Sequence, residues 1–280
     1  MTISDDQPTV AAFPPRALIV TIYGLYARDT SGWLSVSGLI RLLAQLGVDE
    51  PAVRSSISRL KRREILAARR IHGVAGYALS PQARALLDEG DHRIFVRHQA
   101  TLADGWLLAV FSVPESERRQ RHVLRSRLAS LGFGTVSAGV WVAPAHLEAG
   151  TRDALDRQGL TAYIDLFRAD HVAYGEVADQ VATWWDLDAL RATYDDFVTT
   201  HAPVLVAWKR RRSTDGAQAF SDYVRALTAW RRLSYLDPGL PDEVLPADWS
   251  GASAANLFDT LRGRLADPAA EFAAGAARLR

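Results

Sequence analysis

The chain has 280 residues, of which 48% are hydrophobic and 23% are charged, and its formal net charge is +1. This apolar content offsets the entropy of folding, so the composition excludes a wholly disordered chain, and the length favours about two domains or three small ones. A net charge near zero excludes a uniformly basic nucleic-acid coat. The absence of cysteine excludes disulfides, thiolate zinc sites, iron–sulfur clusters and cysteine nucleophiles.

The first residues and the apolar runs predict a cellular location. The first thirteen residues contain Asp5 and Asp6 and no Lys or Arg, whereas a secretory signal begins with a basic stretch followed by an apolar core. The longest apolar runs, such as 106–111, are far shorter than the ~20 residues that span a bilayer. We therefore expect a soluble, cytoplasmic protein without a membrane partner.

The first ninety residues have the element order of a winged helix-turn-helix. Their apolar spacing predicts helices over 16–28, 37–46 and 49–62, then a hairpin with strands at 65–71 and 77–79, then a helix over 81–89. Ser37 and Asp49 are the expected N-caps of the second and third helices, and Pro51 suits a first helical turn. Domain 14–92 is therefore predicted to be a winged helix-turn-helix DNA-binding domain.

Positive charge is concentrated in this region. Residues 54–70 contain seven basic side chains and one acidic side chain, a net charge of +6, whereas residues 128–183 contain three basic and seven acidic ones. A polyanion is therefore expected to bind near the N-terminus.

The third helix is amphipathic, with an apolar side formed by Val53, Ile57 and Leu60. The opposite side carries serines, which permit close approach to a groove, and arginines, which bind guanine edges or phosphates. The alternative is an ordinary solvated helix surface. The predicted DNA-binding residues are Arg54, Ser55, Ser58, Arg59 and Arg62 on this helix, and Arg69 and Arg70 on the hairpin.

The middle of the chain has a βαββαβ order, typical of a ferredoxin-like domain. The predicted elements are a strand over 106–113, a helix over 115–131, strands over 134–137 and 139–142, a helix over 145–158 and a strand over 161–167. We expect domain 93–175 to be this ferredoxin-like module, in an α+β protein. Such modules often pair with a second copy, so it is also the expected dimer contact.

The last part of the chain is predicted to be helical, forming a C-terminal domain over 176–280 with a closing helix around 257–265. The basic run Lys209–Arg212 follows an apolar stretch that ends at Trp208. Basic residues commonly end a helix, and the alternative is a phosphate clamp beside an aromatic pocket for an acyl-coenzyme A.

No pattern indicates a catalytic, metal or cofactor site. The seven histidines lack zinc-ligand spacing, the Ser58-x-x-Lys61 pattern has no Lys-Thr-Gly partner, and no phosphate-binding glycine loop occurs. A metal-dependent nuclease on the ferredoxin-like module would need a carboxylate at the end of its first strand. That strand ends without one, and Glu115 and Glu117 at the next helix start are better explained by the helix dipole.

Several motifs carry a family resemblance. They are PRALIVTIYG at 15–24, VRSSISRL at 53–60, GYALS at 76–80, DGW at 104–106, and two Leu-Pro pairs at 240–241 and 245–246 with Trp249. Together they resemble the PaaX-type repressors of phenylacetic acid catabolism, over about residues 15–265. The resemblance implies a winged-helix domain, a ferredoxin-like domain and a helical C-terminal domain, in a dimer that represses transcription. It also implies release by an aryl-acetyl coenzyme A thioester, and a reading motif at Arg54, Ser55, Ser58 and Arg59.

The sequence therefore predicts a homodimeric DNA-binding transcriptional regulator that is not an enzyme. It would repress transcription at a double-stranded DNA operator until an aryl-acetyl or other acyl-CoA effector releases it. The effector-binding residues are unknown at this stage. The alternatives are a metal-dependent nuclease on the ferredoxin-like domain and a protein-interaction module that does not bind DNA.

Overall fold

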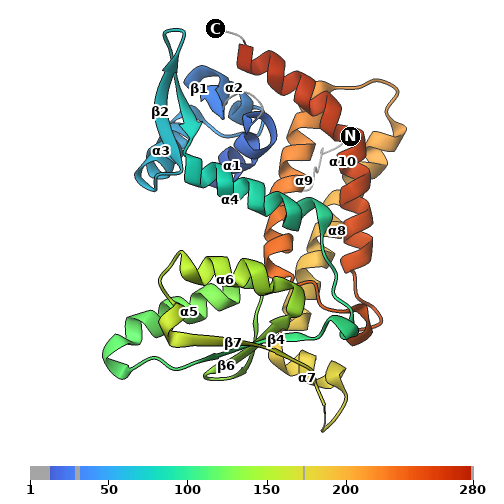
Figure 1. The fold of residues 1–280 in the computed structure, drawn as a ribbon. Coiled ribbons are helices and arrows are strands. Elements are labelled where there is room, and N and C mark those ends of the chain that lie inside the picture. The colour runs from blue at the N-terminus through green and yellow to red at the C-terminus, as the bar shows by residue number, and fades with distance from the viewer. Residues whose placement is uncertain (1–12, 29–31, 173, 279–280) are drawn as a thin grey trace, which may run out of the picture. The chain divides into compact units, whose positions relative to one another are not determined.

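A computed structural model describes residues 13–28, 32–172 and 174–278 (Figure 1). Contacts between its Cα atoms divide the chain into two compact units, one with residues up to 90, 196–230 and 253 onward, the other with 91–195 and 231–252. Both units contain helices from the last third of the chain. The three-domain division at 14–92, 93–175 and 176–280 stays a prediction.

The first unit begins with the predicted winged helix-turn-helix. Its elements are α1 (Pro15–Tyr26), β1 (Trp33–Ser35), α2 (Val36–Ala44), α3 (Glu50–Arg62), β2 (Leu66–Ile71), β3 (Val74–Leu79) and α4 (Pro81–Asp91). The strands form an antiparallel sheet in the order β1-β3-β2, so the β2–β3 hairpin is the wing. The predicted architecture of this region is confirmed.

One element of this region was not predicted, and one predicted cap was wrong. β1 was not predicted, because three residues are too few for a periodic signal. The N-cap of α2 is Ser35, whose hydroxyl accepts from the Gly38 amide at 3.0 Å, and not Ser37. After this strand the helix begins two residues earlier than the apolar pattern indicated.

β1 also explains a glycine in the wing. Gly76 lies opposite Ser35 in the sheet, and a Cβ atom there would come within 2.4 Å of the Trp33 ring and of the Leu34 carbonyl oxygen. The Trp33 indole in turn donates to the Arg69 carbonyl at 3.0 Å. Only glycine leaves room for the indole, which ties the three strands together.

The α-helices after residue 176 are α7 (Val177–Trp184), α8 (Leu187–Arg210), α9 (Gly216–Leu236) and α10 (Gly251–Arg278). In the first unit, the ring of Trp230 on α9 stacks on Phe258 of α10, with centroids 4.7 Å apart, and packs against Phe197 of α8. α10 is much longer than the predicted 257–265. Its second half is rich in alanine, the best helix former, and it continues past Pro268.

The second unit contains the predicted ferredoxin-like domain. Its elements are β4 (Trp106–Phe111), α5 (Arg118–Leu131), β5 (Gly134–Ser137), β6 (Val140–Pro144), α6 (Glu148–Asp156) and β7 (Ile164–Ala169). The antiparallel sheet has the order β5-β6-β4-β7, which is the ferredoxin-like topology, and this prediction is confirmed.

Alternating side chains of the sheet bury both of its faces. Leu107 and Ala109 pack into one core with Leu124 and Leu128 of α5 and Leu155 of α6. Figure 1 shows α5 and α6 side by side over that face of the sheet. Trp106 and Val142 belong to a second core with residues of α7 and of the segment 240–249. The two helices α5 and α6 therefore share one surface of this domain.

Among the described residues, no helix combines the length and the apolar character that a membrane crossing requires.

Candidate nucleic-acid interface

The candidate site is built on α3, whose ends are defined by its sequence. The Asp49 carboxylate accepts a hydrogen bond from the Ala52 amide at 2.8 Å, and Pro51 occupies the first turn, as predicted. At the other end Glu64 has φ 56°, which ends the helix and turns the chain into the wing.

The inner side of α3 is fully packed. Val53, Ile57 and Leu60 are buried, as the apolar spacing predicted, and Ser56 is buried with them. They pack in a core with α1 and α2, where Tyr23 donates its hydroxyl to the Tyr77 carbonyl of β3 at 2.9 Å. Burial raises the pKa of Tyr23, so this hydroxyl remains a donor at neutral pH. This core fixes the rotation of α3 about its axis.

The outer side of α3 is free of other protein in the described residues. All five predicted residues on it are exposed, namely Arg54, Ser55, Ser58, Arg59 and Arg62. At 100° per residue Ser55, Ser58 and Arg62 lie at the centre of the outer face, with Arg54 and Arg59 on its two flanks.

The two flanking arginines have partners on the helix itself. Arg54 forms an ion pair with Glu50, 2.6 Å between Nη2 and Oε1. Arg59 donates from Nη2 to the Ser55 hydroxyl at 3.2 Å. Both contacts are exposed, and a surface ion pair of this kind is worth less than about 1 kcal/mol, so a stronger acceptor can replace either partner.

The wing presents its two arginines separately. Arg69 lies opposite Gly76 and Arg70 opposite Ala75, and both side chains are exposed. Because successive side chains of a strand project from opposite faces, the two guanidinium groups lie on different sides of the hairpin. The structure does not bring the pair together, and one backbone strand approaching from one side meets only one of them.

The turn between α2 and α3 is held by side chains from the far end of the sequence. The Ser221 hydroxyl of α9 donates to the Gln45 carbonyl at 2.8 Å, and Arg225 donates to the Leu46 carbonyl at 3.1 Å. These contacts satisfy carbonyl oxygens that the end of α2 leaves without helical partners. Sequence reasoning missed both positioning residues, since no local pattern links positions about 180 residues apart.

The structure gives no support to a nuclease site or a metal site among the described residues. Glu115, a candidate for a nuclease, is ion-paired with Arg121 at 3.1 Å, and Glu117 accepts from the Tyr163 hydroxyl. Among the described residues no cluster of three His, Asp or Glu side chains is placed to hold a metal ion.

The basic end of α8 favours ordinary helix termination over the alternative of a phosphate clamp beside an aromatic pocket. Trp208 is buried, and its indole donates to the Asp222 carboxylate at 2.7 Å. The Arg211 guanidinium already lies over the Trp208 ring, 4.3 Å from its centroid. The ring is therefore a core residue rather than a free stacking surface.

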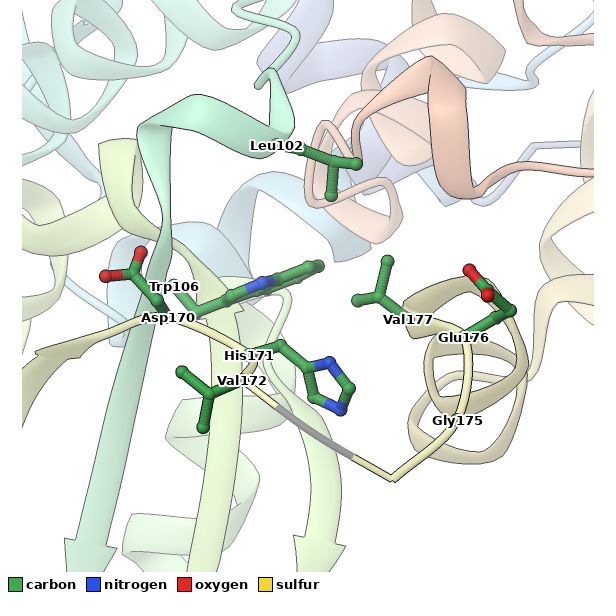
Figure 2. Close-up of a pocket in the computed structure, with 8 residues that line it drawn as sticks. All are labelled: Leu102, Trp106, Asp170, His171, Val172, Gly175, Glu176 and Val177. Carbon is green, nitrogen blue, oxygen red and sulfur yellow. The ribbon is translucent and has the colours of Figure 1, made fainter.

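A pocket of about 390 Å³ lies in the second unit, between the start of β4, the segment after β7 and the start of α7 (Figure 2). Its wall includes the Trp106 ring and the apolar Val172 and Val177, and its polar groups are Asp170, His171 and Glu176. None of the described residues lining it is Lys or Arg. Two carboxylates without a cation do not suit the phosphates of a coenzyme A thioester.

Comparisons with known proteins agree with the fold. Three domain families match consecutive segments: PaaX-like protein over residues 14–83, PaaX protein central Cas2-like domain over 99–181, and PaaX-like protein C-terminal domain over 185–275. Transcriptional repressor PaaX of Escherichia coli (strain K12) is 26% identical over 275 residues, which is 95% of this chain and 85% of that protein. The solved structure of uncharacterized protein Rv0674 from Mycobacterium tuberculosis has a TM-score of 0.59 at 24% identity, and the match covers 92% of this chain and 98% of that one.

Proposed function

Because the chain belongs to the PaaX-like family, we propose that it is a DNA-binding transcriptional repressor whose helix α3 enters the major groove. The observation that supports this most directly is the outer face of α3, where two serines and three arginines project from a helix with a fixed inner side. The similar protein of Escherichia coli is named a transcriptional repressor. A regulator of this kind acts where the DNA is, in the cytoplasm.

The residues on the outer face suit two kinds of contact. Arg59 and Arg62 can form bidentate hydrogen bonds with guanine edges, and the short hydroxyls of Ser55 and Ser58 allow the helix to approach the bases closely. Arg69 or Arg70 would contact backbone phosphate from the wing, which positions the protein without reading sequence.

We further propose that the protein works as a homodimer on two half-sites. Two copies of α3 would then read half-sites separated by about one helical turn, 10 to 10.5 base pairs, or a multiple of it. The ferredoxin-like domain is the proposed dimer contact. Sedimentation of the free protein and of its DNA complex tests this stoichiometry.

Release by an aryl-acetyl or other acyl-CoA completes the proposal, and it rests on the family alone. Such a ligand must bind a DNA-free conformation more tightly than the DNA-bound one, since equal affinity for both would shift nothing. Thermal unfolding with phenylacetyl-CoA and with free phenylacetate tests it. A rise in Tm with the thioester alone supports the proposal, and no shift with either compound contradicts phenylacetyl-CoA as the effector.

The central experiment begins with selection of bound fragments from genomic DNA, followed by anisotropy titration of one selected duplex. Arg59→Ala and Arg62→Ala should each weaken binding by roughly 5-fold to 150-fold, the 1 to 3 kcal/mol of a bidentate base contact. Arg264→Ala, an exposed arginine of α10 in the same unit, is the matched control for lost charge. Unchanged affinity in both α3 variants would remove α3 from the interface.

A further inference from the structure

Helix α5 of the ferredoxin-like domain is the most positively charged helix of the described chain. It contains five arginines and no acidic residue, a net charge of +5, whereas α3 contains four basic residues and one acidic residue. The proposed DNA-reading function uses none of the five.

The arginines of α5 divide into two groups. Arg121 and Arg127 lie beside the buried Leu124 and Leu128 and are only half exposed, and Arg121 donates to the Val113 carbonyl at 2.8 Å. The other three, Arg118, Arg119 and Arg125, are fully on the outer side together with His122 and Ser126.

These three outer arginines have no intramolecular task. In the described part of the chain none of them forms an ion pair or a side-chain hydrogen bond, whereas Arg54 and Arg59 of α3 do. Neither the helix nor its neighbours therefore neutralise their charge. Three like charges on one helix repel one another, which an ordinary stabilising surface pattern avoids.

The neighbouring helix α6 carries the opposite charge to α5, so the two sides of this domain differ in charge. α6, which lies beside α5 over the same face of the sheet, contains three acidic residues and one arginine. Its Arg152 and also Arg168 of β7 are held by Glu148, at 3.6 Å and 2.8 Å. One side of this domain is therefore cationic with unpaired arginines, and the adjoining side is anionic with paired ones.

We infer that the outer face of α5 is a second phosphate-binding surface for duplex DNA, separate from α3. Guanidinium groups match phosphate geometry better than ammonium groups do, and all the basic side chains of this face except the histidine are arginines. Arg118 and Arg125 are seven positions apart, a rise of about 10 Å along the helix, which corresponds to about three phosphates of one strand. The inference rests on the proposed DNA-binding function and adds a contact that reads no sequence.

The test is a salt titration with a fluorescein-labelled 60-base-pair duplex of mixed sequence, because non-specific binding reports phosphate contacts alone. The variant Arg118→Ala/Arg119→Ala/Arg125→Ala should weaken binding about 10-fold or more in 100 mM KCl. The slope of log K against log salt should become shallower by about 2 to 3 per chain, since each lost phosphate contact removes about 0.9. The variant with lysine at the same three positions should retain most of the slope.

The matched control is Arg152→Ala/Arg157→Ala/Arg168→Ala, which removes the same charge from exposed positions of the same domain. It should leave the slope of the wild type unchanged. An equal loss in both triple variants would overturn the inference, because it would reflect total charge rather than the α5 surface. Circular dichroism checks folding, and the single variant Arg119→Glu replaces the triple variant if the latter unfolds.

The outcomes separate the two proposals. If the wild type does not bind the duplex in 50 mM KCl, the DNA-binding function itself fails. If the wild type binds and the α5 variant has the same affinity and slope, only this inference fails, and an acidic protein surface becomes the alternative partner of α5.

Discussion

Helices α3 and α5 are both amphipathic and rich in arginine, yet they hold their arginines differently. On α3 the flanking Arg54 and Arg59 are oriented by Glu50 and Ser55. On α5 the outer arginines have no such partner among the described residues. Side chains that are already oriented lose less entropy on binding, which suits recognition of individual base edges, whereas unrestrained charges suit a backbone that is the same at every sequence. Similar composition on two helices can thus serve different contacts.

The comparison assumes that α3 and α5 belong to two units that unfold separately. Substitutions in the two cores test this assumption, and they have the largest expected effect on the free energy of unfolding. Ile57→Ala on α3 and Leu124→Ala on α5 each remove a buried side chain and should each lower the free energy of unfolding by about 2 to 5 kcal/mol. Hydrogen exchange followed by mass spectrometry should show faster exchange mainly in the unit that carries the substitution. Equal acceleration across both units by either variant would mean that they unfold as one.

A buried histidine provides the next test, in the unit of α3. Burial lowers the pKa of His201 to about 4 from its usual 6.5, so the folded state favours the neutral ring. The stability that this neutral ring contributes is complete above pH 6.5 and is lost as the pH falls toward 4. The loss between pH 7 and pH 5 is about 2 kcal/mol of the free energy of unfolding. In urea titrations at pH 7 and pH 5, His201→Gln should reduce the pH-dependent loss by about that amount.

His122→Gln, on the exposed side of α5, is the control for replacing a histidine with glutamine outside the core. The unit of α5 also contains a histidine with a lowered pKa. Burial and the nearby His98 lower the pKa of His146 to about 4. If His201→Gln and the wild type lose equal stability between pH 7 and pH 5, the imidazole of His201 is not desolvated as the structure indicates.

The sequence was sufficient for those parts of the site that depend on local patterns. The inner residues Val53, Ile57 and Leu60 and the exposure of the predicted arginines on α3 follow from the 3.6-residue period, and the Asp49 cap follows from the preference of helix starts for that residue type. The order of the ferredoxin-like elements was likewise predicted from local patterns, since strands and helices differ in the spacing of their apolar residues. Whether the seven predicted residues bind DNA stays a prediction.

Contacts between distant segments could not be predicted. Nothing near Ser221 or Arg225 indicates that they hold the turn before α3, and nothing near Trp33 indicates that its ring covers Gly76. The charge of α5 was overlooked for a different reason. The acidic segment 128–183 begins directly after Arg127, the last arginine of α5, so its negative net charge does not include this helix.

A substitution at the α2–α3 turn should have a smaller effect on stability, and it should alter DNA binding through α3 without altering the contribution of α5. Arg225→Ala leaves the partly buried Leu46 carbonyl without its donor and should lower the free energy of unfolding by about 1 to 2 kcal/mol. It should also weaken binding to the selected duplex several-fold, because α3 is held less firmly, without changing the salt slope that α5 contributes. Arg264→Ala again serves as the control, and a changed salt slope in Arg225→Ala would mean that this arginine itself contacts phosphate.

The smallest expected effect concerns the first turn of each helix. Asp49→Ala removes the side-chain cap of α3 and should cost about 0.5 to 1 kcal/mol, because the Ala52 amide loses its acceptor. Glu117 stands at the same position before α5, but its side chain makes no capping hydrogen bond and instead accepts from the exposed Tyr163 hydroxyl, so Glu117→Ala should cost less. Urea titration of both variants measures the difference. An equal cost would mean that the helix dipole and the Tyr163 hydrogen bond of Glu117 together contribute as much as the Asp49 cap does.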